Sequence, residues 1–203
     1  MNTKQTNILV IGSGLAGAIA ALTAAEENKK VILITNCKKL LSGNTRWAQG
    51  GIAYSHTNDS IQTFKKDILD AGGNNNYETA VDQLVNKGSK LIEELLIKKF
   101  KIPFEQDPNN QLVFTSEAAH SVNRIIHCKD VTGITIHTQI IQQIKTHPNI
   151  NIYNNYTAID LLTYSHHSSN STDIYNMPAC FGAVILNNKN KEIKIINSDQ
   201  TIL

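Results

Sequence analysis

The most constraining feature of the chain is an apolar run that leads directly into three regularly spaced glycines. Residues 7–11 read Asn-Ile-Leu-Val-Ile, and Gly12, Gly14 and Gly17 follow in the pattern G-x-G-x-x-G. The small and apolar residues that come next favour a helix. A strand, a glycine-rich turn and a helix in this order are typical of a dinucleotide-binding βαβ unit.

Each glycine has a physical role in such a unit. Gly12 permits the tight turn out of the strand, Gly14 lets the backbone approach a pyrophosphate, and Gly17 lets the helix pack closely on the sheet. The pyrophosphate is expected at the helix N-terminus, where unpaired N–H groups and the helix dipole favour an anion. We therefore predict a cofactor-binding turn formed by Gly12, Ser13, Gly14, Leu15, Ala16 and Gly17.

The residues after the second predicted strand leave the identity of the nucleotide open. Residues 31–34 read Val-Ile-Leu-Ile, which is typical of a buried parallel strand. An acidic residue that binds the ribose usually follows, but here the chain continues Thr35, Asn36 and Cys37. We expect Asn36, Cys37 or their backbones to take its place, and this unit alone does not distinguish FAD from NAD. The alternative, that these glycines form a turn in an unrelated α/β protein, is disfavoured by the strands and helix predicted around them.

Composition narrows the class of protein. Charged residues make up 18% of the 203 residues, the formal net charge is +2, and the lysines and arginines are scattered. These values do not predict a nucleic-acid or membrane-surface partner. The three cysteines, Cys37, Cys128 and Cys180, are far apart and outside any CxxC pattern, so we expect reduced thiols. No apolar run approaches the roughly 18 residues of a membrane span, and the early strand leaves no room for a signal peptide. We expect a cytoplasmic protein.

The rest of the pattern predicts an α/β fold. Helices are expected at 59–71, at 79–99 and at 133–146, a sheet strand at 149–153, a polar loop at 165–172 and a hairpin at 181–196. Thr79 and Asp82 resemble a capping box. An apolar stripe on the second helix comprises Val81, Leu84, Val85, Leu91, Ile92, Leu95 and Leu96. Residues 200–203 start one more strand. The expected architecture is a Rossmann-like domain with an inserted lobe, a parallel sheet and a hairpin or meander. We expect it to be incomplete at the C-terminus, with an unpaired sheet edge at 200–203.

A second glycine-rich segment raises the specificity. Residues 42–53 read Ser-Gly-Asn-Thr-Arg-Trp-Ala-Gln-Gly-Gly-Ile-Ala. With the opening turn, this segment resembles the flavoprotein family of L-aspartate oxidase, succinate dehydrogenase and fumarate reductase, in which it lines the flavin. The resemblance implies FAD contacts at Asn44, Thr45, Arg46, Trp47, Ala48, Gln49, Gly50 and Gly51, and on the adenine side at Thr157 and Ala158. Glycines fit this position because a backbone without Cβ can approach a planar ring closely.

A third segment resembles the L-aspartate oxidase branch of the family. Residues 116–133 contain Glu117, His120 and Arg124 in an order similar to that of the branch, with Ala118-Ala119 in place of its Gly-Gly. The resemblance implies that Glu117 holds the substrate ammonium, and that His120 and Arg124 contact a substrate carboxylate. The alternatives are a solvated glutamate and a structural ion pair. If either alanine needs a positive φ, its methyl group costs roughly 1 kcal/mol.

Other histidines and the covalent state of the flavin complete the predicted site. Asn44 stands where the covalently flavinylated branch carries His, which implies non-covalent FAD. We interpret His127 and His137 as core or interface histidines, and His166 and His167 as loop residues. We find no metal site, because no third ligand lies at a useful spacing.

The implied reaction is the oxidation of L-aspartate to iminoaspartate, with O2 or fumarate reoxidising FAD. The product would feed NAD biosynthesis, which makes quinolinate synthase a candidate partner. The resemblance covers nearly all 203 residues but less than half of a family enzyme, so we expect an N-terminal part of the FAD-binding domain that is inactive alone. The alternatives are a non-catalytic FAD-binding remnant or partner module, a succinate dehydrogenase- or fumarate reductase-like flavoprotein, and an NAD-binding domain.

Overall fold

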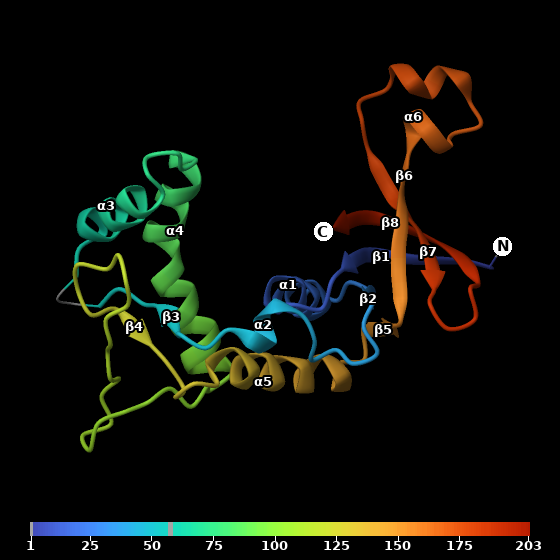
Figure 1. The fold of residues 1–203 in the computed structure, drawn as a ribbon. Coiled ribbons are helices and arrows are strands. Elements are labelled where there is room, and N and C mark those ends of the chain that lie inside the picture. Colours follow the sequence, from blue (N-terminus) through green and yellow to red (C-terminus); the bar gives the residue numbers. More distant parts are fainter. Residues whose placement is uncertain (1, 57–58) are drawn as a thin grey trace. The chain divides into compact units, whose positions relative to one another are not determined.

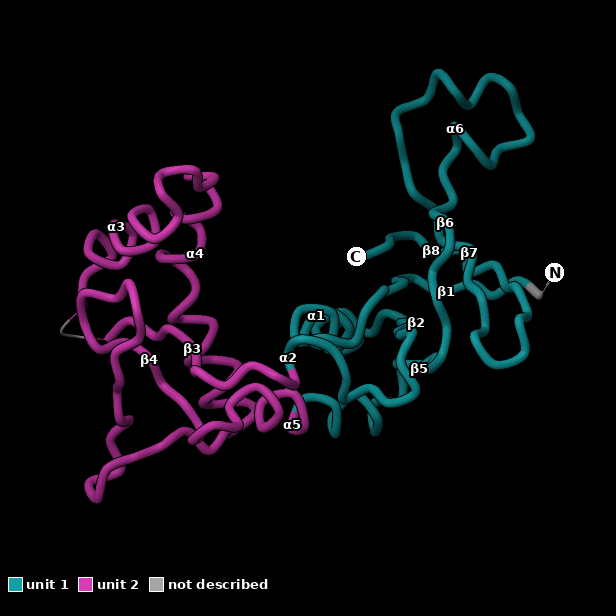
Figure 2. Tube along the Cα trace, in the orientation of Figure 1, with its two compact units in different colours: residues 1–45, 140–203 teal, residues 46–139 magenta. Residues whose placement is uncertain are grey.

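The computed structural model describes residues 2–56 and 59–203. The chain forms two compact units, which Figure 2 colours separately. Unit 1 comprises residues 1–45 and 140–203, and unit 2 comprises residues 46–139. Unit 2 is therefore an insertion between the two sequence segments of unit 1.

Unit 1 is built on a six-stranded sheet with the order β5-β2-β1-β8-β7-β6 (Figure 1). The strands β1 (Asn2–Ile11), β2 (Val31–Thr35), β5 (Ile150–Asn154) and β8 (Ile193–Ile202) run parallel. The strands β7 (Cys180–Asn187) and β6 (Tyr156–Thr163) continue the sheet as an antiparallel meander. The predicted α/β class, with a mostly parallel sheet and a meander, is confirmed.

Apolar burial explains why the centre of this sheet forms. All five residues of β2 are buried, as expected for a parallel strand covered on both faces. The helix α1 (Leu15–Glu26) buries Leu22 and three alanines, Ala18, Ala21 and Ala25, and the small alanine side chains allow close packing. One core cluster consists of Leu9, Ile32, Ile34, Ala183, Ile185 and Ile196.

The second half of unit 1 contains one strand that the sequence analysis did not predict, and it corrects the interpretation of residues 200–203. The strand β6 was missed, because its alternation is broken by a register shift between Ala158 and Asp160. Residues 200–203 do not start a new strand: Gln200, Thr201 and Ile202 extend β8 and pair with β1. In the described residues the pairing of β8 with β7 ends at Asn197, so Gln200, Thr201 and Ile202 pair on the β1 side only, and the outermost strands of the sheet are β5 and β6.

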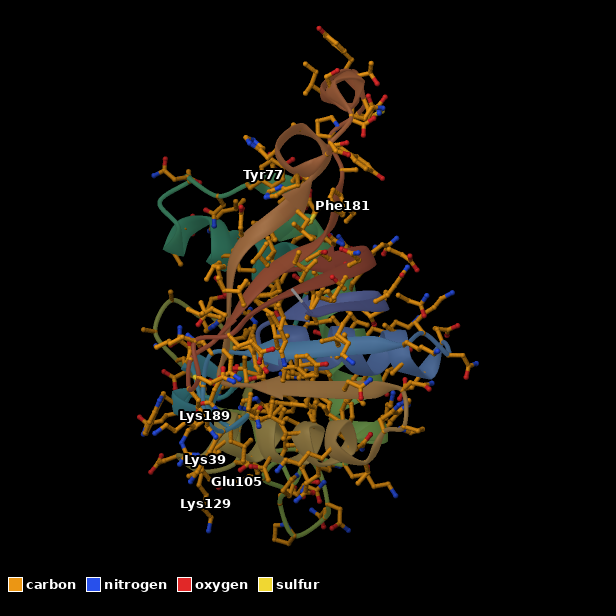
Figure 3. All side chains as sticks on the ribbon, turned by 90° about the vertical axis from the view of Figure 1, so that its right-hand side faces the viewer. Lys39, Tyr77, Glu105, Lys129, Phe181 and Lys189 are labelled. Carbon is orange, nitrogen blue, oxygen red and sulfur yellow. The ribbon has the colours of Figure 1, made fainter. Side chains whose placement is uncertain are left out.

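The polar segment predicted as a loop at 165–172 contains short helical turns. These are α6 (Tyr164–His167) and a 3-10 helix, η2 (Ser171–Tyr175). The Tyr164 ring lies against Phe181, labelled in Figure 3 at the start of β7, with ring centroids 5.1 Å apart. Local Asn and Asp side chains also form hydrogen bonds here, such as Thr172 N to Asn170 Oδ1 at 3.1 Å.

Unit 2 is mainly helical. It contains α3 (Ile61–Ala71), α4 (Glu78–Leu91) and a π-helical continuation, η1 (Ile92–Lys99). Its two-stranded antiparallel sheet pairs β3 (Ile52–Ala53) with β4 (Ile125–Ile126). The unit boundaries fall within α2 (Asn44–Trp47) and α5 (Thr132–Thr146). Phe64, Val81 and Val85 form a small core between α3 and α4.

The structure also corrects details of the predicted helices. The capping box was wrong, because α4 begins at Glu78 with Tyr77 as N-cap and has no side-chain cap hydrogen bond. In the predicted stripe, Leu84 and Leu91 are about half exposed, at 51% and 50%. Since α3 packs against the side of α4 that carries Val81 and Val85, the buried stripe is narrower than the apolar pattern.

Two simpler expectations agree with the structure. Ser60 caps α3 by accepting a hydrogen bond from Thr63 N, and α3 ends before Gly72. The helix α5 ends at Thr146, before His147-Pro148, and buries Ile140, Ile141 and Ile144.

In the described part of the chain no helix is long and apolar enough to cross a membrane. The three cysteines are free thiols.

Candidate functional site

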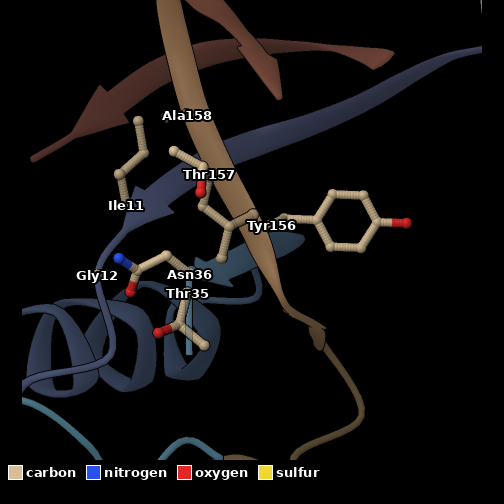
Figure 4. A pocket seen from close by; sticks show the side chains of 8 residues that line it. Ile11, Gly12, Thr35, Asn36, Tyr156, Thr157 and Ala158 are labelled. Carbon is tan, nitrogen blue, oxygen red and sulfur yellow. The ribbon is translucent and has the colours of Figure 1, made fainter. Parts of the chain in front are cut away.

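A cavity of about 270 Å³ lies at the carboxyl ends of β1 and β2 in unit 1 (Figure 4). Its lining includes Gly12, Asn36 and residues 156–158 at the start of β6. The crevice beyond the carboxyl ends of parallel strands is where open α/β sheets bind ligands. The structure thus brings the predicted Gly12, Thr157 and Ala158 together around one cavity.

The glycine turn has the backbone geometry that the sequence predicted. Gly12 has φ +114°, which a residue with Cβ rarely adopts. A Cβ on Gly17 would overlap the carbonyl oxygen of Gly12. The turn and the close helix packing assigned to these two glycines are therefore confirmed.

The N-terminus of α1 fits an anionic group. Its N-cap is Gly14, there is no side-chain cap hydrogen bond, and its first turn contains no acidic residue. Leu15 N donates to Thr45 Oγ1 at 3.1 Å, which places Thr45 beside this turn. The buried Ser13 hydroxyl instead donates to Leu40 O at 3.1 Å, so its side chain joins the glycine turn to the segment after β2. Backbone N–H groups and the helix dipole remain to stabilise a pyrophosphate.

The ribose side of the cavity is neutral. Asn36 lines the cavity where an acidic residue is usual, and its Oδ1 accepts from Cys37 Sγ at 3.2 Å. Thr157 Oγ1 shares a hydrogen bond with the Asn188 side chain at 3.1 Å. Sequence analysis missed Tyr156, which lines the cavity, and Asn188, which supports it. No motif marked either residue: Tyr156 begins the unpredicted strand β6, and Asn188, in the turn after β7, is connected to the cavity by its hydrogen bonds to Thr157 Oγ1 and Asn36 O.

The second glycine-rich segment lies on the surface of unit 2. Residues 46–50 are exposed, including Trp47 at 73%. The guanidinium of Arg46 lies 5.4 Å from the centre of the Trp47 ring. Ala48 O accepts a hydrogen bond from Gly133 N at 2.9 Å, which joins this segment to the start of α5. The predicted flavin-lining residues are thus accessible to a ligand.

A second cavity, of about 300 Å³, lies within unit 2. Its lining combines two of the predicted segments: Gln49, Gly50, Thr115, Ser116, Glu117, His127, Lys129 and Asp130. A Cβ on Gly50 would lie 3.3 Å from Glu117 Oε1, so the glycine segment and the glutamate form adjacent walls. Glu117 is exposed, and its carboxylate can accept hydrogen bonds from an ammonium group.

His127 also lines this second cavity, although the sequence suggested a core or interface histidine. Its side chain is 18% exposed, and its Nδ1 lies 4.0 Å from Glu105 Oε2. Its Nε2 atom is buried without a hydrogen-bond partner among the described residues. His137, by contrast, is fully buried in α5, as expected.

Arg124, predicted as a substrate contact, lies at the centre of a buried ionic cluster. Its side chain is fully buried, and it precedes β4 rather than starting a helix. Nε and Nη2 donate to the two oxygens of Asp59 at 2.8 and 3.0 Å, and Nη1 donates to Asp67 Oδ2. The guanidinium also lies 4.7 Å from the centre of the Phe64 ring. The geometry is that of the alternative interpretation, a structural ion pair.

The cluster shifts the pKa of all three charged groups. Burial alone would raise the carboxyl pKa of Asp59 and Asp67, but the hydrogen bonds and charge of Arg124 outweigh it and hold both pKa values below normal. The Arg124 pKa is raised, chiefly by its hydrogen bonds to Asp59. The carboxylates therefore stabilise the fold above the ordinary carboxyl pKa, and this contribution is lost as pH falls through their lowered values.

His120 is joined to the same cluster. Its Nδ1 lies 2.8 Å from Arg124 Nη1. Because arginine only donates hydrogen bonds, Nδ1 must accept, and the ring proton is on Nε2. His120 is not among the residues that line the Glu117 cavity. In the described part of the chain, no group of three or more His, Cys, Asp and Glu residues is arranged to hold a metal.

Comparison with known proteins identifies the fold family. Residues 7–203 match the family described as FAD binding domain. The chain belongs to this FAD-binding family. The predicted cofactor, FAD, is thereby confirmed, and the α1 N-terminus, whose N-cap is a glycine, and the adjoining cavity fit its nucleotide half.

The chain is similar to L-aspartate oxidases, as the sequence segments indicated. It is 37% identical to the L-aspartate oxidase of Halobacterium salinarum over 80% of this chain and 31% of that protein. It is 33% identical to that of Clostridium acetobutylicum over 98% of this chain and 42% of that protein. The chain therefore spans about a third of the length of the curated relatives it matches.

The fold also matches solved flavoproteins. An E. coli quinol fumarate reductase superimposes with a TM-score of 0.85 over 99% of this chain and 32% of that chain, at 21% identity. This likeness confirms the fold that the sequence predicted for the FAD-binding domain.

Proposed function

We propose that this chain forms part of a flavin-dependent enzyme that oxidises L-aspartate to iminoaspartate. The observation that carries the proposal is the adjacency of Glu117 and Gly50 in a unit 2 cavity, in a chain similar to L-aspartate oxidases. The bound flavin would supply the redox chemistry by accepting a hydride from the substrate. The chain's own residues bind the cofactor and orient the substrate.

Unit 1 supplies the groups for the nucleotide half of FAD. The backbone N–H groups of Gly14, Ala16 and Gly17 at the N-terminus of α1 would hold the pyrophosphate, since that of Leu15 donates to Thr45 Oγ1, and Asn36 and Thr157 would hydrogen-bond the adenosine side. Residues 44–51 contact the flavin ring. Asn44 stands where the covalently flavinylated branch of the resembled family carries a histidine, and this supports non-covalent binding of FAD.

Glu117 is the proposed substrate-orienting residue. Its carboxylate binds the α-ammonium of L-aspartate, while Lys129, which lines the same cavity, can attract a substrate carboxylate. His120 Nε2–H is a further donor, whereas the buried Arg124 acts through its neighbours. O2 or fumarate would reoxidise the flavin, and the unstable imine product would pass to a consuming enzyme such as quinolinate synthase in the cytoplasm.

The first test measures FAD binding by the purified 203-residue chain. We expect bound flavin in the absorbance spectrum, and its complete release into the supernatant after acid precipitation. Flavin that stays with the precipitate would contradict non-covalent binding. Because the chain spans about a third of its relatives, we expect it to release no peroxide with L-aspartate when assayed alone. Turnover above free flavin would show that the remaining length is unnecessary.

The second test separates L-aspartate oxidation from simple fumarate chemistry. In the FAD-loaded protein that contains this chain, Glu117→Gln should impair L-aspartate oxidation far more than fumarate reduction, since fumarate has no ammonium. The exposed Glu94→Gln substitution in η1 is the matched control and should change neither. Equal losses would favour a structural Glu117 and a fumarate reductase-like enzyme. Flavin binding without either activity would favour a non-catalytic module.

A further inference from the structure

We infer that Arg124 is a positioning residue: clamped between Asp59 and Asp67, it holds Glu117 against the Gln49–Gly50 wall of the unit 2 cavity. Its side chain has no exposed surface and cannot itself touch a ligand in that cavity. The inference rests on the proposed function only for the role of Glu117 in recognising L-aspartate. The physical linkage is independent of that role.

The side-chain half of the linkage runs from the ionic cluster to the Glu117 turn. Asp67 Oδ2 accepts hydrogen bonds from both Ser121 N and Ser121 Oγ, each at 2.9 Å. Arg124 Nη1 donates to His120 Nδ1 at 2.8 Å, and His120 N donates to Glu117 O at 3.2 Å. Hydrogen bonds to charged groups are roughly twice as strong as neutral ones. The turn is therefore anchored at two successive residues to buried charges.

The backbone half of the linkage runs from Arg124 to the glycine wall. Arg124 O accepts a hydrogen bond from Tyr54 N at 2.7 Å. Directly after Arg124, β4 pairs with β3, with Ala53 opposite Ile125 and Ile52 opposite Ile126. Since β3 begins immediately after Gly51, this pairing fixes the exit of the glycine segment. Arg124 is thus connected by hydrogen bonds to both walls of the cavity.

The backbone of the turn indicates that these anchors are needed. Ala119 has φ +68°, and it is an alanine without a polar side chain that would stabilise this left-handed conformation. Such strain persists only where the surrounding structure determines it. The bonds at Glu117, His120 and Ser121 surround Ala119 on both sides and supply that determination.

Hydrogen exchange in the 203-residue chain tests the linkage without any substrate. Asp67→Asn removes the buried charge, and amides of residues 118–121 should exchange about tenfold faster or more. Asp70→Asn, the same change on an exposed position of α3, is the control and should leave them unchanged. If Asp67→Asn does not fold, the milder Ser121→Ala decides the question by the same measurement. Unchanged exchange in a folded Asp67→Asn or Ser121→Ala variant overturns the inference.

Steady-state kinetics of the FAD-loaded protein that contains this chain test the consequence. Asp67→Asn should raise the KM for L-aspartate far more than the KM for fumarate, which has no ammonium for Glu117 to hold. It should add no further loss in a Glu117→Gln background, because both changes act through one carboxylate. Equal effects on both substrates, or additive losses, would mean a merely structural cluster and overturn the inference. Wild-type protein without L-aspartate oxidation would refute the proposed function, while the exchange measurement would still decide the linkage.

Discussion

Different interactions stabilise the interior of each of the two units. Unit 1 has a six-stranded sheet whose core cluster consists of fully or nearly fully buried apolar side chains such as Leu9, Ile185 and Ile196. The described part of unit 2 has two strands of two residues each, and the largest of its fully buried side chains is the charged Arg124. The nucleotide cavity is thus formed at the ends of strands that are joined by backbone hydrogen bonds, whereas the Glu117 cavity depends on side-chain hydrogen bonds.

Because of this difference, we expect the two cavities to respond differently to amino-acid substitutions. In unit 1 the backbone positions the ligand groups, so many side chains can vary as long as volume and pattern are kept. In unit 2 the Glu117 turn is anchored by three ionised groups whose burial is costly unless all partners are present. Loss of one partner should therefore affect unit 2 much more than a comparable surface change.

The largest expected effect is that of Arg124→Met. The substitution leaves Asp59 and Asp67 without their buried counter-charge and should destabilise unit 2 by roughly 3–5 kcal/mol. Chemical denaturation, monitored by hydrogen exchange in peptides from residues 46–139, measures this loss of stability. Lys65→Met, which removes partly exposed ion pairs to Glu78 and Asp82 in the same unit, is the matched control and should have a much smaller effect. Similar losses in the two variants would contradict the comparison.

The same contrast explains how much of the fold was predictable from the sequence. In unit 1, continuous apolar runs such as 31–34 and the glycine turn at 12–17 carry local signals, and the structure places them as expected. The strand β6 and the true extent of β8 were missed, because strand pairing is non-local and a register shift hides the alternation.

The candidate site in unit 2 was predictable only as a set of segments. The resemblance brought Gln49, Gly50 and Glu117 into one hypothesis, and the structure places them around one cavity. Nothing in the spacing of Asp59, Asp67 and Arg124 predicts their ion pairs, since their contacts span 57 and 65 residues of sequence. A buried charge pair leaves no periodic signal, which is why Arg124 looked like a ligand contact.

A smaller but sharp effect is expected for Gly17→Ala in unit 1. The added methyl would overlap the carbonyl oxygen of Gly12, and the helix must move, at a cost of about 1–3 kcal/mol. FAD affinity should fall with it, because the α1 N-terminus shifts. Gly88→Ala in α4 is the matched control: nothing lies within 4 Å of its added Cβ, so it should stabilise the protein slightly. Thermal unfolding and flavin titration of both variants make the measurement, and equal behaviour would refute the packing role of Gly17.

The smallest expected effect has the opposite sign. Ala119→Gly removes the methyl group from a residue at φ +68°, which should stabilise unit 2 by about 0.5–1 kcal/mol after the extra flexibility of glycine in the unfolded chain is counted. The neighbouring Ala118→Gly is the control: Ala118 is not in a left-handed conformation, so the same change should destabilise. Denaturant midpoints of the two variants, measured side by side, give the comparison. If the Ala119→Gly midpoint falls as far as that of Ala118→Gly, the turn is not strained in solution, and the buried charges of unit 2 hold a relaxed loop.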